Sequence, residues 1–151
     1  MTQLSAHFTQ AMFEADATLP AECVEPYRRL AEDILEPVFA IRPVTVTSGY
    51  RPPEANAAAH GVPHSQHIAT ANWCAADIHP ADGNVAGPTV TALYDAIRAS
   101  NIPFDRCGLE WNRDETRYII HLSWSRTPPR GTCFRGPEGG PYVEVPRDDG
   151  D

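Results

Sequence analysis

Residues 106–123, with the sequence RCGLEWNRDETRYIIHLS, decide the fold that we predict for this chain. The segments 106–111 and 117–123 contain the aromatic and β-branched residues that favour strands. Between them, residues 112–116 (NRDET) are polar and carry the Asn and Asp residues that are typical of turns. We therefore predict two antiparallel strands joined as a hairpin.

The predicted hairpin brings Glu110 and His121 close together on neighbouring strands. Their side chains share one face of the sheet if the pairing register allows it. Successive residues of a strand point to opposite faces, so His121 points away from the face that Ile120 and Leu122 occupy. We expect the apolar face to pack on the core and the polar side chains to lie on the other face.

A long amphipathic helix is predicted over residues 20–41. Apolar side chains recur there at three- and four-residue steps, which is the period of one helix face. They are Val24, Tyr27, Leu30, Ile34, Leu35, Val38 and Phe39. Pro37 is expected to bend or stop the helix near its end.

The remaining segments alternate between short strands and helices. β-Branched residues predict a strand over 44–48, and a second short strand is predicted over 75–78. Helices are predicted over 52–60, where prolines and a glutamate suit the first turn, and over 85–100. We predict an α+β fold whose helices cover one face of a small, mainly antiparallel sheet, with the functional site on the other face.

Length and composition indicate one folded domain followed by a tail. The chain has 151 residues, an ordinary length for one domain. We place the domain at residues 1–125 and an irregular, Pro- and Gly-rich C-terminal tail at residues 126–151. Residues 142–145 (YVEV) could add an edge strand to the sheet or to a partner.

The charge of the chain argues against nucleic acid as a partner. Twelve basic residues, all Arg, stand against 20 acidic ones, so the formal net charge is −8, whereas binding to a phosphate backbone needs clustered cations. No apolar run approaches the ~20 residues of a membrane span, and the N-terminus lacks the features of a signal peptide. We therefore expect no membrane partner and a protein that is cytoplasmic when synthesised and acts after release or as part of a particle.

Two histidines and one aspartate are the candidate ligands of a zinc ion. His67 stands ten residues before Asp77, and His121 follows far downstream. A catalytic zinc site takes three such protein ligands and leaves one position open for water. Because Zn–ligand bonds measure ~2.0–2.2 Å, the side chains of His67 and Asp77 must lie within ~8 Å of each other.

Other metal ligands stay open at this stage. His60 and His64 have the four-residue spacing that binds metal on a helix, although an intervening glycine and proline would break that helix. The four cysteines form no C-x-x-C pair, which excludes a zinc ribbon. Cys74 and Cys107 lie near the site in sequence, but a small buried apolar role is the default for such residues.

Three motifs surround these candidate ligands. VTVTSGYRPPEAN (44–56), GVPHSQH (61–67) and AADI (75–78) occur in this order, and a later strand supplies the second histidine. The order resembles that of the zinc D-alanyl-D-alanine carboxypeptidase family, murein peptidases that include many phage endolysins, from about residue 4 to about residue 125. The resemblance implies a D-Ala-D-Ala peptidase or hedgehog-like fold, a Zn²⁺ cofactor, and hydrolysis of D-alanine-containing stem or cross-link peptides of peptidoglycan.

Three further residues receive roles in this hypothesis. Glu110 is the candidate general base, which takes a proton from the attacking water and returns it to the leaving nitrogen. Arg51, in the Ser-Gly-Tyr-Arg turn, would bind the terminal carboxylate of the substrate or the developing oxyanion. Ser65 would hydrogen-bond the substrate or orient the ligand loop. Glu115 and Asp105 are nearby carboxylates that could be plain solvated charges.

The segment between His67 and Asp77 departs from the family pattern. The usual glycine is missing, and the connection is about three residues longer, which implies a differently shaped turn. We interpret it as a loop insertion because residues 75–78 keep the family order. The long loop and the tail also suit a catalytically silent module that retains the fold, either to bind cell wall or to build a phage tail or virion with other virion or tail proteins. A zinc amidase or peptidase acting on non-murein peptides is a third hypothesis.

Overall fold

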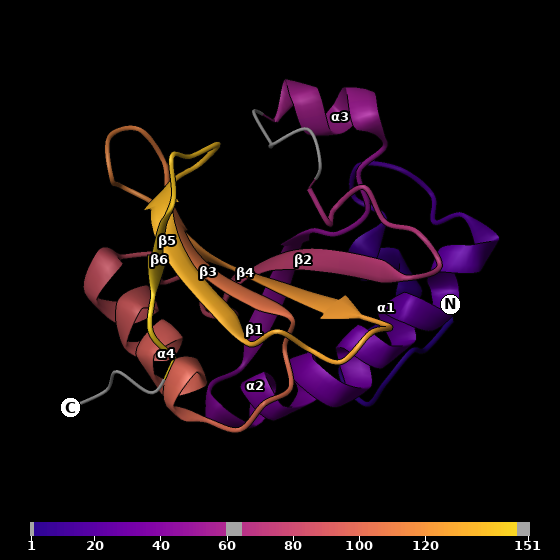
Figure 1. Ribbon diagram of the computed structural model, residues 1–151, viewed down its shortest axis with the longest axis horizontal. Helices are drawn as coiled ribbons and strands as arrows, with labels where there is room; N and C mark the ends of the chain where they lie inside the picture. The colour runs from indigo at the N-terminus through magenta and orange to yellow at the C-terminus, as the bar shows by residue number, and fades with distance from the viewer. Residues whose placement is uncertain (1, 60–64, 148–151) are drawn as a thin grey trace.

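A six-stranded sheet with the order β1-β2-β4-β3-β5-β6 organises the protein (Figure 1). The computed structural model describes residues 2–59 and 65–147. Every neighbouring pair of strands is antiparallel except β3 and β5, which are parallel. The strands are β1 (Val44–Ser48), β2 (Trp73–Pro80), β3 (Arg106–Trp111), β4 (Tyr118–Ser125), β5 (Thr132–Pro137) and β6 (Val143–Val145). The prediction of an α+β fold with a mainly antiparallel sheet is confirmed.

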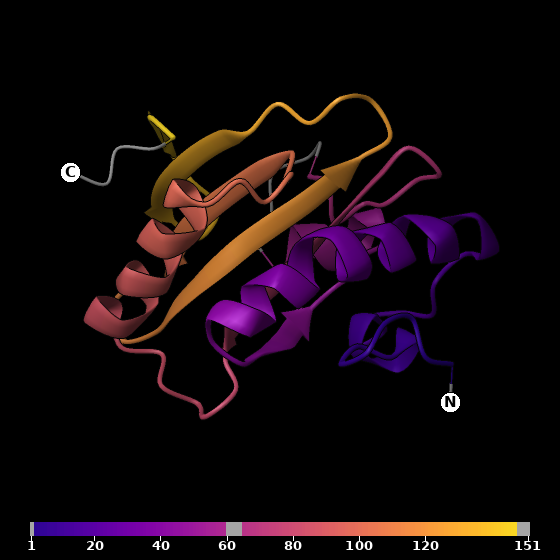
Figure 2. The same ribbon diagram turned by 90° about the horizontal axis from the view of Figure 1, so that it is seen from below.

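Two sets of helices pack on the sheet, one around α1 (Val24–Leu30) and the other formed by α4 (Gly87–Ala99). α1 contacts β2 and β4, and α4 contacts β3 and β4. α2 (Glu36–Ile41) continues the first set and touches α4, while the short α3 (Pro53–Ala58) stands apart (Figures 1 and 2). Two 3₁₀ turns, Gln10–Phe13 and Ala21–Cys23, precede α1.

The helix predicted over residues 20–41 is continuous but not uniform. A π-helical turn, Ala31–Leu35, lies between α1 and α2. Pro37 does not stop the segment, because it occupies the first turn of α2, and the helix runs on to Ile41. Proline has no N–H for the helical ladder, so a wider turn directly before it is a natural adjustment.

The core lies between the helices and one face of the sheet. Ile78 of β2 and the β4 residues Ile120 and Leu122 are fully buried in it. Tyr27 of α1 is also fully buried, and its hydroxyl donates to the carbonyl of Ala75 at 2.7 Å. All four cysteines are buried in this core, so the apolar role expected for Cys74 and Cys107 is confirmed.

The prediction of an irregular tail from residue 126 onward is wrong for two segments. β5 pairs with β3, and β6 pairs with β5 as the edge strand that the YVEV segment suggested. Gly108 of β3 makes this pairing close, because a Cβ atom at that position would lie 2.1 Å from Cζ of Phe134 in β5. The sheet therefore extends well beyond residue 125.

Among the described residues, no helix combines the length and the apolar character that crossing a membrane requires.

Candidate metal centre

The face of the sheet opposite the core carries the candidate ligands. Asp77 of β2 is paired directly with His121 of β4, and His121 is paired on its other side with Gly108 of β3. Residues paired across strands point to the same face, so Asp77 and His121 lie side by side. Glu110 pairs with Ile119, two residues from His121, and shares that face as the hairpin predicts.

His67 reaches this face from the loop before β2. The backbone N–H of Arg51 donates to the carbonyl of His67 at 2.8 Å, which ties the ligand loop to the turn after β1. The backbone N–H of His67 donates to the hydroxyl of Ser65 at 3.1 Å. Ser65 thus contacts the backbone of the ligand loop, and its role in orienting that loop or binding substrate stays a prediction.

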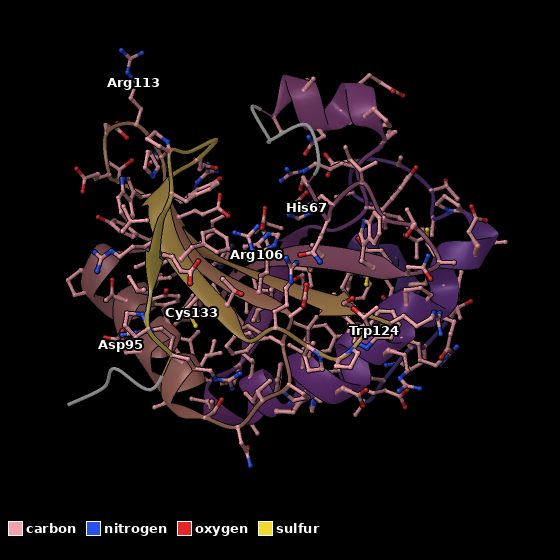
Figure 3. The ribbon with its side chains drawn as sticks, viewed as in Figure 1. His67, Asp95, Arg106, Arg113, Trp124 and Cys133 are labelled. Atoms are coloured by element: carbon pink, nitrogen blue, oxygen red, sulfur yellow. The ribbon has the colours of Figure 1, made fainter. Side chains whose placement is uncertain are left out.

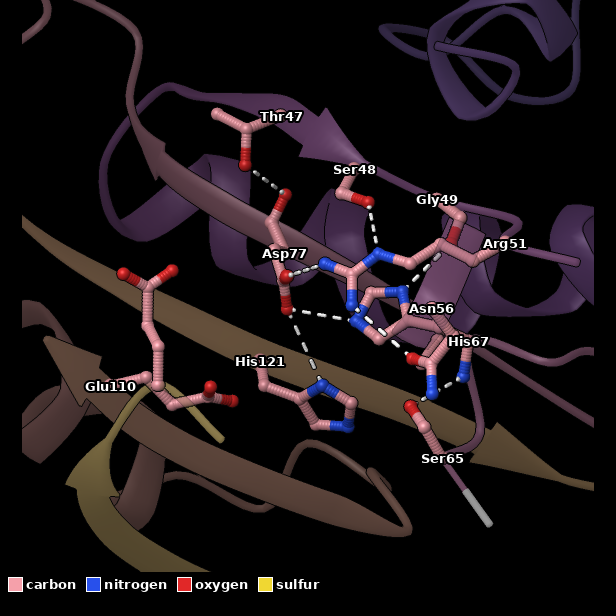
Figure 4. A network of polar contacts seen from close by, with 12 residues as sticks. Thr47, Ser48, Gly49, Arg51, Asn56, Ser65, His67, Asp77, Glu110 and His121 are labelled. Atoms are coloured by element: carbon pink, nitrogen blue, oxygen red, sulfur yellow. Dashed lines mark hydrogen bonds and ion pairs between the residues drawn. The ribbon is translucent and has the colours of Figure 1, made fainter. Parts of the chain in front are cut away.

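The three candidate ligands converge in a buried cluster. Nε2 of His67 lies 3.0 Å from Oδ1 of Asp77, and Nδ1 of His121 lies 3.4 Å from the same oxygen. The candidate ligand atoms all lie within 4.8 Å of one another (Figure 4). The expected proximity of His67 and Asp77 is confirmed, and the separations suit donors that share one ion at bond lengths of ~2.0–2.2 Å.

The protonation of the cluster favours a cation. Nδ1 of His67 lies 2.7 Å from the carbonyl of Gly49, so Nδ1 donates to that carbonyl and Nε2 is the nitrogen that faces Asp77. Burial lowers the pKa of His121, despite its hydrogen bond with Asp77, so a neutral imidazole is favoured. Burial opposes ionisation of Asp77, but His67 and the hydrogen bond with His121 hold its pKa well below the usual range. Two imidazoles and a carboxylate are a donor set that zinc accepts.

Arg51 holds the second oxygen of Asp77. Its three guanidinium nitrogens donate to Oδ2 of Asp77 at 2.9 Å, Oγ of Ser48 at 2.9 Å and Oδ1 of Asn56 at 3.5 Å. This leaves Oδ1 of Asp77 directed at both histidines. Arg51 thus orients a candidate ligand, whereas its predicted contact with a substrate stays a prediction.

A family model described as Peptidase M15 matches residues 7–103. The chain belongs to the peptidase M15 family. The matched segment contains His67 and Asp77 and ends before Glu110 and His121, which the fold brings to the same face. The comparisons with curated proteins and with solved structures returned no match.

Glu110 of this M15 peptidase lines the same pocket as the three candidate ligands. Its side chain is buried, and Tyr142 donates a hydrogen bond to its Oε1 at 3.1 Å. Burial, together with the negative charge of Asp77, raises the pKa of Glu110 to about 8. The contact between Tyr142 and Glu110 was not predicted from the sequence. The two residues are 32 positions apart, and Tyr142 lies in the segment predicted as an irregular tail.

The longer connection between His67 and Asp77 forms a turn beside the site. The side chain of Trp73 donates to the carbonyl of Ile68 at 3.2 Å, and the guanidinium of Arg126 donates to that of Ala71 at 2.7 and 3.0 Å. The extra residues are thus held by their own contacts, and Asp77 remains beside His67.

The other candidates raised by the sequence lie elsewhere. Cys74 and Cys107 are buried in the core and are not part of the described His–Asp–His cluster. Glu115 accepts a hydrogen bond from Tyr118 in the exposed hairpin loop. Asp105 pairs with Arg130 at 2.6 Å and is therefore no plain solvated charge. His60 and His64 lie outside the described residues.

The raised pKa of Glu110 predicts a pH effect on the metal-free protein. The folded state keeps a proton on Glu110 up to about pH 8, whereas the unfolded chain releases it near the ordinary value of 4.5. The stabilising contribution is present at low pH and is lost as the pH rises to about 8, by on the order of 4 kcal/mol. Urea unfolding with a chelator at pH 5, 6.5 and 8 should show wild type losing stability relative to Glu110→Gln. Parallel pH profiles for the two proteins would contradict the assigned environment.

Proposed function

We propose that this M15 peptidase is a zinc-dependent hydrolase of peptidoglycan peptides. His67, Asp77 and His121 would hold the zinc ion. The observation that carries the proposal is the arrangement of these three buried side chains, with Glu110 in the same pocket. Family membership supports peptide hydrolysis as the reaction class. When bound, zinc would polarise the scissile carbonyl and lower the pKa of a water molecule toward ~7.

The protein side of the mechanism centres on Glu110. In its ionised form Glu110 accepts a proton from the attacking water and afterwards delivers it to the departing amine. Tyr142 holds Oε1 of Glu110, and Oε2 has no hydrogen-bond partner among the described residues, so it can meet that water. Arg51 keeps Asp77 in place throughout. A positive ion near Glu110 would favour its carboxylate form, which a base requires.

We place the substrate among D-alanine-containing stem and cross-link peptides, following the resemblance of the motifs. The enzyme would act as a D,D-carboxypeptidase or murein endopeptidase on the cell wall, as a lysin released from the cell or as part of a phage particle. If the enzyme is part of a phage particle, we expect it to contact other virion or tail proteins.

Metal analysis paired with digestion of purified peptidoglycan tests the proposal. We expect one zinc per chain, and mass spectrometry of the soluble products should show peptides cut beside D-alanine. The chelated protein should release none of these products, and added zinc should restore them. Cleavage of non-murein peptides alone would instead favour a zinc amidase or peptidase that does not act on the cell wall. A zinc-loaded wild type that binds peptidoglycan without cleaving it would point to the silent wall-binding module.

A further inference from the structure

Arg106 is a second arginine in the pocket, and the mechanism above does not use it. It begins β3 and shares a face with Gly108 and Glu110, because alternate residues of a strand point the same way. It lines the same pocket as His67, His121 and Glu110, and Figure 3 shows it beside His67 near the middle of the molecule. Arg106 therefore lies within reach of a peptide that occupies this pocket.

The guanidinium of Arg106 is held in position without an anion. It stacks on Phe134, with Cζ 4.3 Å from the ring centroid, and Phe134 occupies the space that Gly108 leaves open. Within residues 2–59 and 65–147, no acceptor takes a hydrogen bond from this guanidinium and no carboxylate pairs with it. Its charge is thus oriented and available.

Two acidic groups near Arg106, Asp105 and Glu138, are paired with other arginines, and the third, Glu110, accepts a hydrogen bond from Tyr142. Asp105, its neighbour in sequence, binds Arg130 at 2.6 Å and accepts from Gln66 at 2.8 Å. Glu138, across the pocket, is paired with Arg117 at 3.0 Å. Burial, with a contribution from the positive charge of Arg130, lowers the pKa of Arg106, although the negative charges of Asp105 and Glu110 act in the opposite direction.

Of the two described arginines that line the pocket, Arg51 has hydrogen-bond acceptors and Arg106 has none among the described residues. Each guanidinium nitrogen of Arg51 already donates to a protein oxygen, and one of those oxygens belongs to Asp77. A substrate carboxylate that took Arg51 would compete with this support of a candidate ligand. Arg106 has no such commitment, and a planar guanidinium is well suited to carboxylate recognition.

We propose that Arg106 binds a carboxylate of the substrate peptide and makes the enzyme selective for acidic over neutral peptides at that position. The proposal rests on the proposed function, because it assumes that a peptide occupies the pocket beside the metal. The carboxylate has two chemical sources, the free C-terminus of the peptide and an acidic side chain near the scissile bond.

Calorimetry with the zinc-loaded Glu110→Gln protein tests this without turnover. One ligand pair is N-acetyl-D-alanyl-D-alanine and its C-terminal carboxamide. The second pair, acetyl-D-glutamyl-D-alaninamide and acetyl-D-glutaminyl-D-alaninamide, isolates a side-chain carboxylate. We expect the acid of at least one pair to bind about 10- to 100-fold more tightly than its neutral partner, the range of a hydrogen bond to a charged group.

The arginine variants assign that preference. In the Glu110→Gln protein, the further substitution Arg106→Gln should abolish the preference for the acidic peptide. Arg106→Lys in the same protein should keep part of that preference. Arg113→Gln, in the exposed hairpin loop, is the matched control and should leave the preference unchanged. Circular dichroism verifies folding of each variant. A preference that survives Arg106→Gln, or equal binding of acid and neutral peptides to the parent protein, would overturn the inference while leaving zinc-dependent hydrolysis intact. Failure of the peptidoglycan digestion alone would instead overturn the proposed function.

Discussion

Replacement of His121 by alanine is expected to abolish stoichiometric zinc binding. The imidazole supplies one of three buried ligand atoms that lie within 4.8 Å of one another, and two remaining donors cannot close the site. The affinity should fall by more than about 100-fold, the upper end of what the loss of an outer hydrogen-bond partner costs. Asp77→Asn should act in the same direction, because the amide removes the negative charge between the two histidines.

Two controls make the ligand assignment specific. His79→Ala changes a histidine that is not a candidate ligand. His79 lies in β2, its ring contacts the carbonyl of Pro80, and its loss should leave zinc content near wild type. Cys74→Ala removes the thiol closest in sequence to the site, although that thiol is buried in the core. Metal analysis after dialysis decides the matter. Zinc retained by His121→Ala and lost from Cys74→Ala would replace our ligand set with a thiolate site.

Substitution of Glu110 by glutamine is expected to lower kcat by about 10²- to 10⁴-fold, the range that general acid–base catalysis contributes. Glutamine keeps the size of the side chain and can still accept a hydrogen bond from Tyr142, but it has no carboxylate to take a proton. Zinc content should stay near wild type because Glu110 is not one of the three candidate ligands. Peptidoglycan hydrolysis followed by mass spectrometry gives the rate.

Glu115→Gln is the matched control for this substitution. Glu115 lies in the exposed loop of the same hairpin and bonds Tyr118, so its replacement should leave turnover unchanged. Wild-type turnover in Glu110→Gln would assign the base to another group. A zinc-loaded wild type without any hydrolysis would identify a wall-binding or virion module that retains the fold, since such a module needs no base.

The hairpin was predictable because its signals are local. Polar turn residues separate two short apolar segments, and the alternation around His121 fixes which face it occupies. The candidate ligand set was also within reach, because the order of the S-G-Y-R, S-Q-H and A-A-D-I motifs resembles a known family. The helix over residues 20–41 followed from its apolar period, although the π-helical turn before Pro37 did not.

The last quarter of the chain was not predictable in the same way. Its many prolines, glycines and arginines suggested an irregular tail, yet β5 forms a parallel pair with β3. That pairing depends on Gly108, which leaves room for Phe134, and neither residue shows in its own segment that the other will lie against it. A parallel neighbour distant in sequence has no turn signal to announce it.

The sequence by itself determined the type of most elements and the residues that could hold a metal, because periodicity, turn chemistry and motif order are local properties of the chain. Only the tertiary structure decided how the two arginines divide their roles. Arg51 is engaged with Asp77, whereas no acceptor within the described part of the chain takes a hydrogen bond from Arg106, which faces the pocket. The same holds for Tyr142 against Glu110. Hydrogen-bond partners depend on which segments meet in space, and that depends on the packing of the whole sheet.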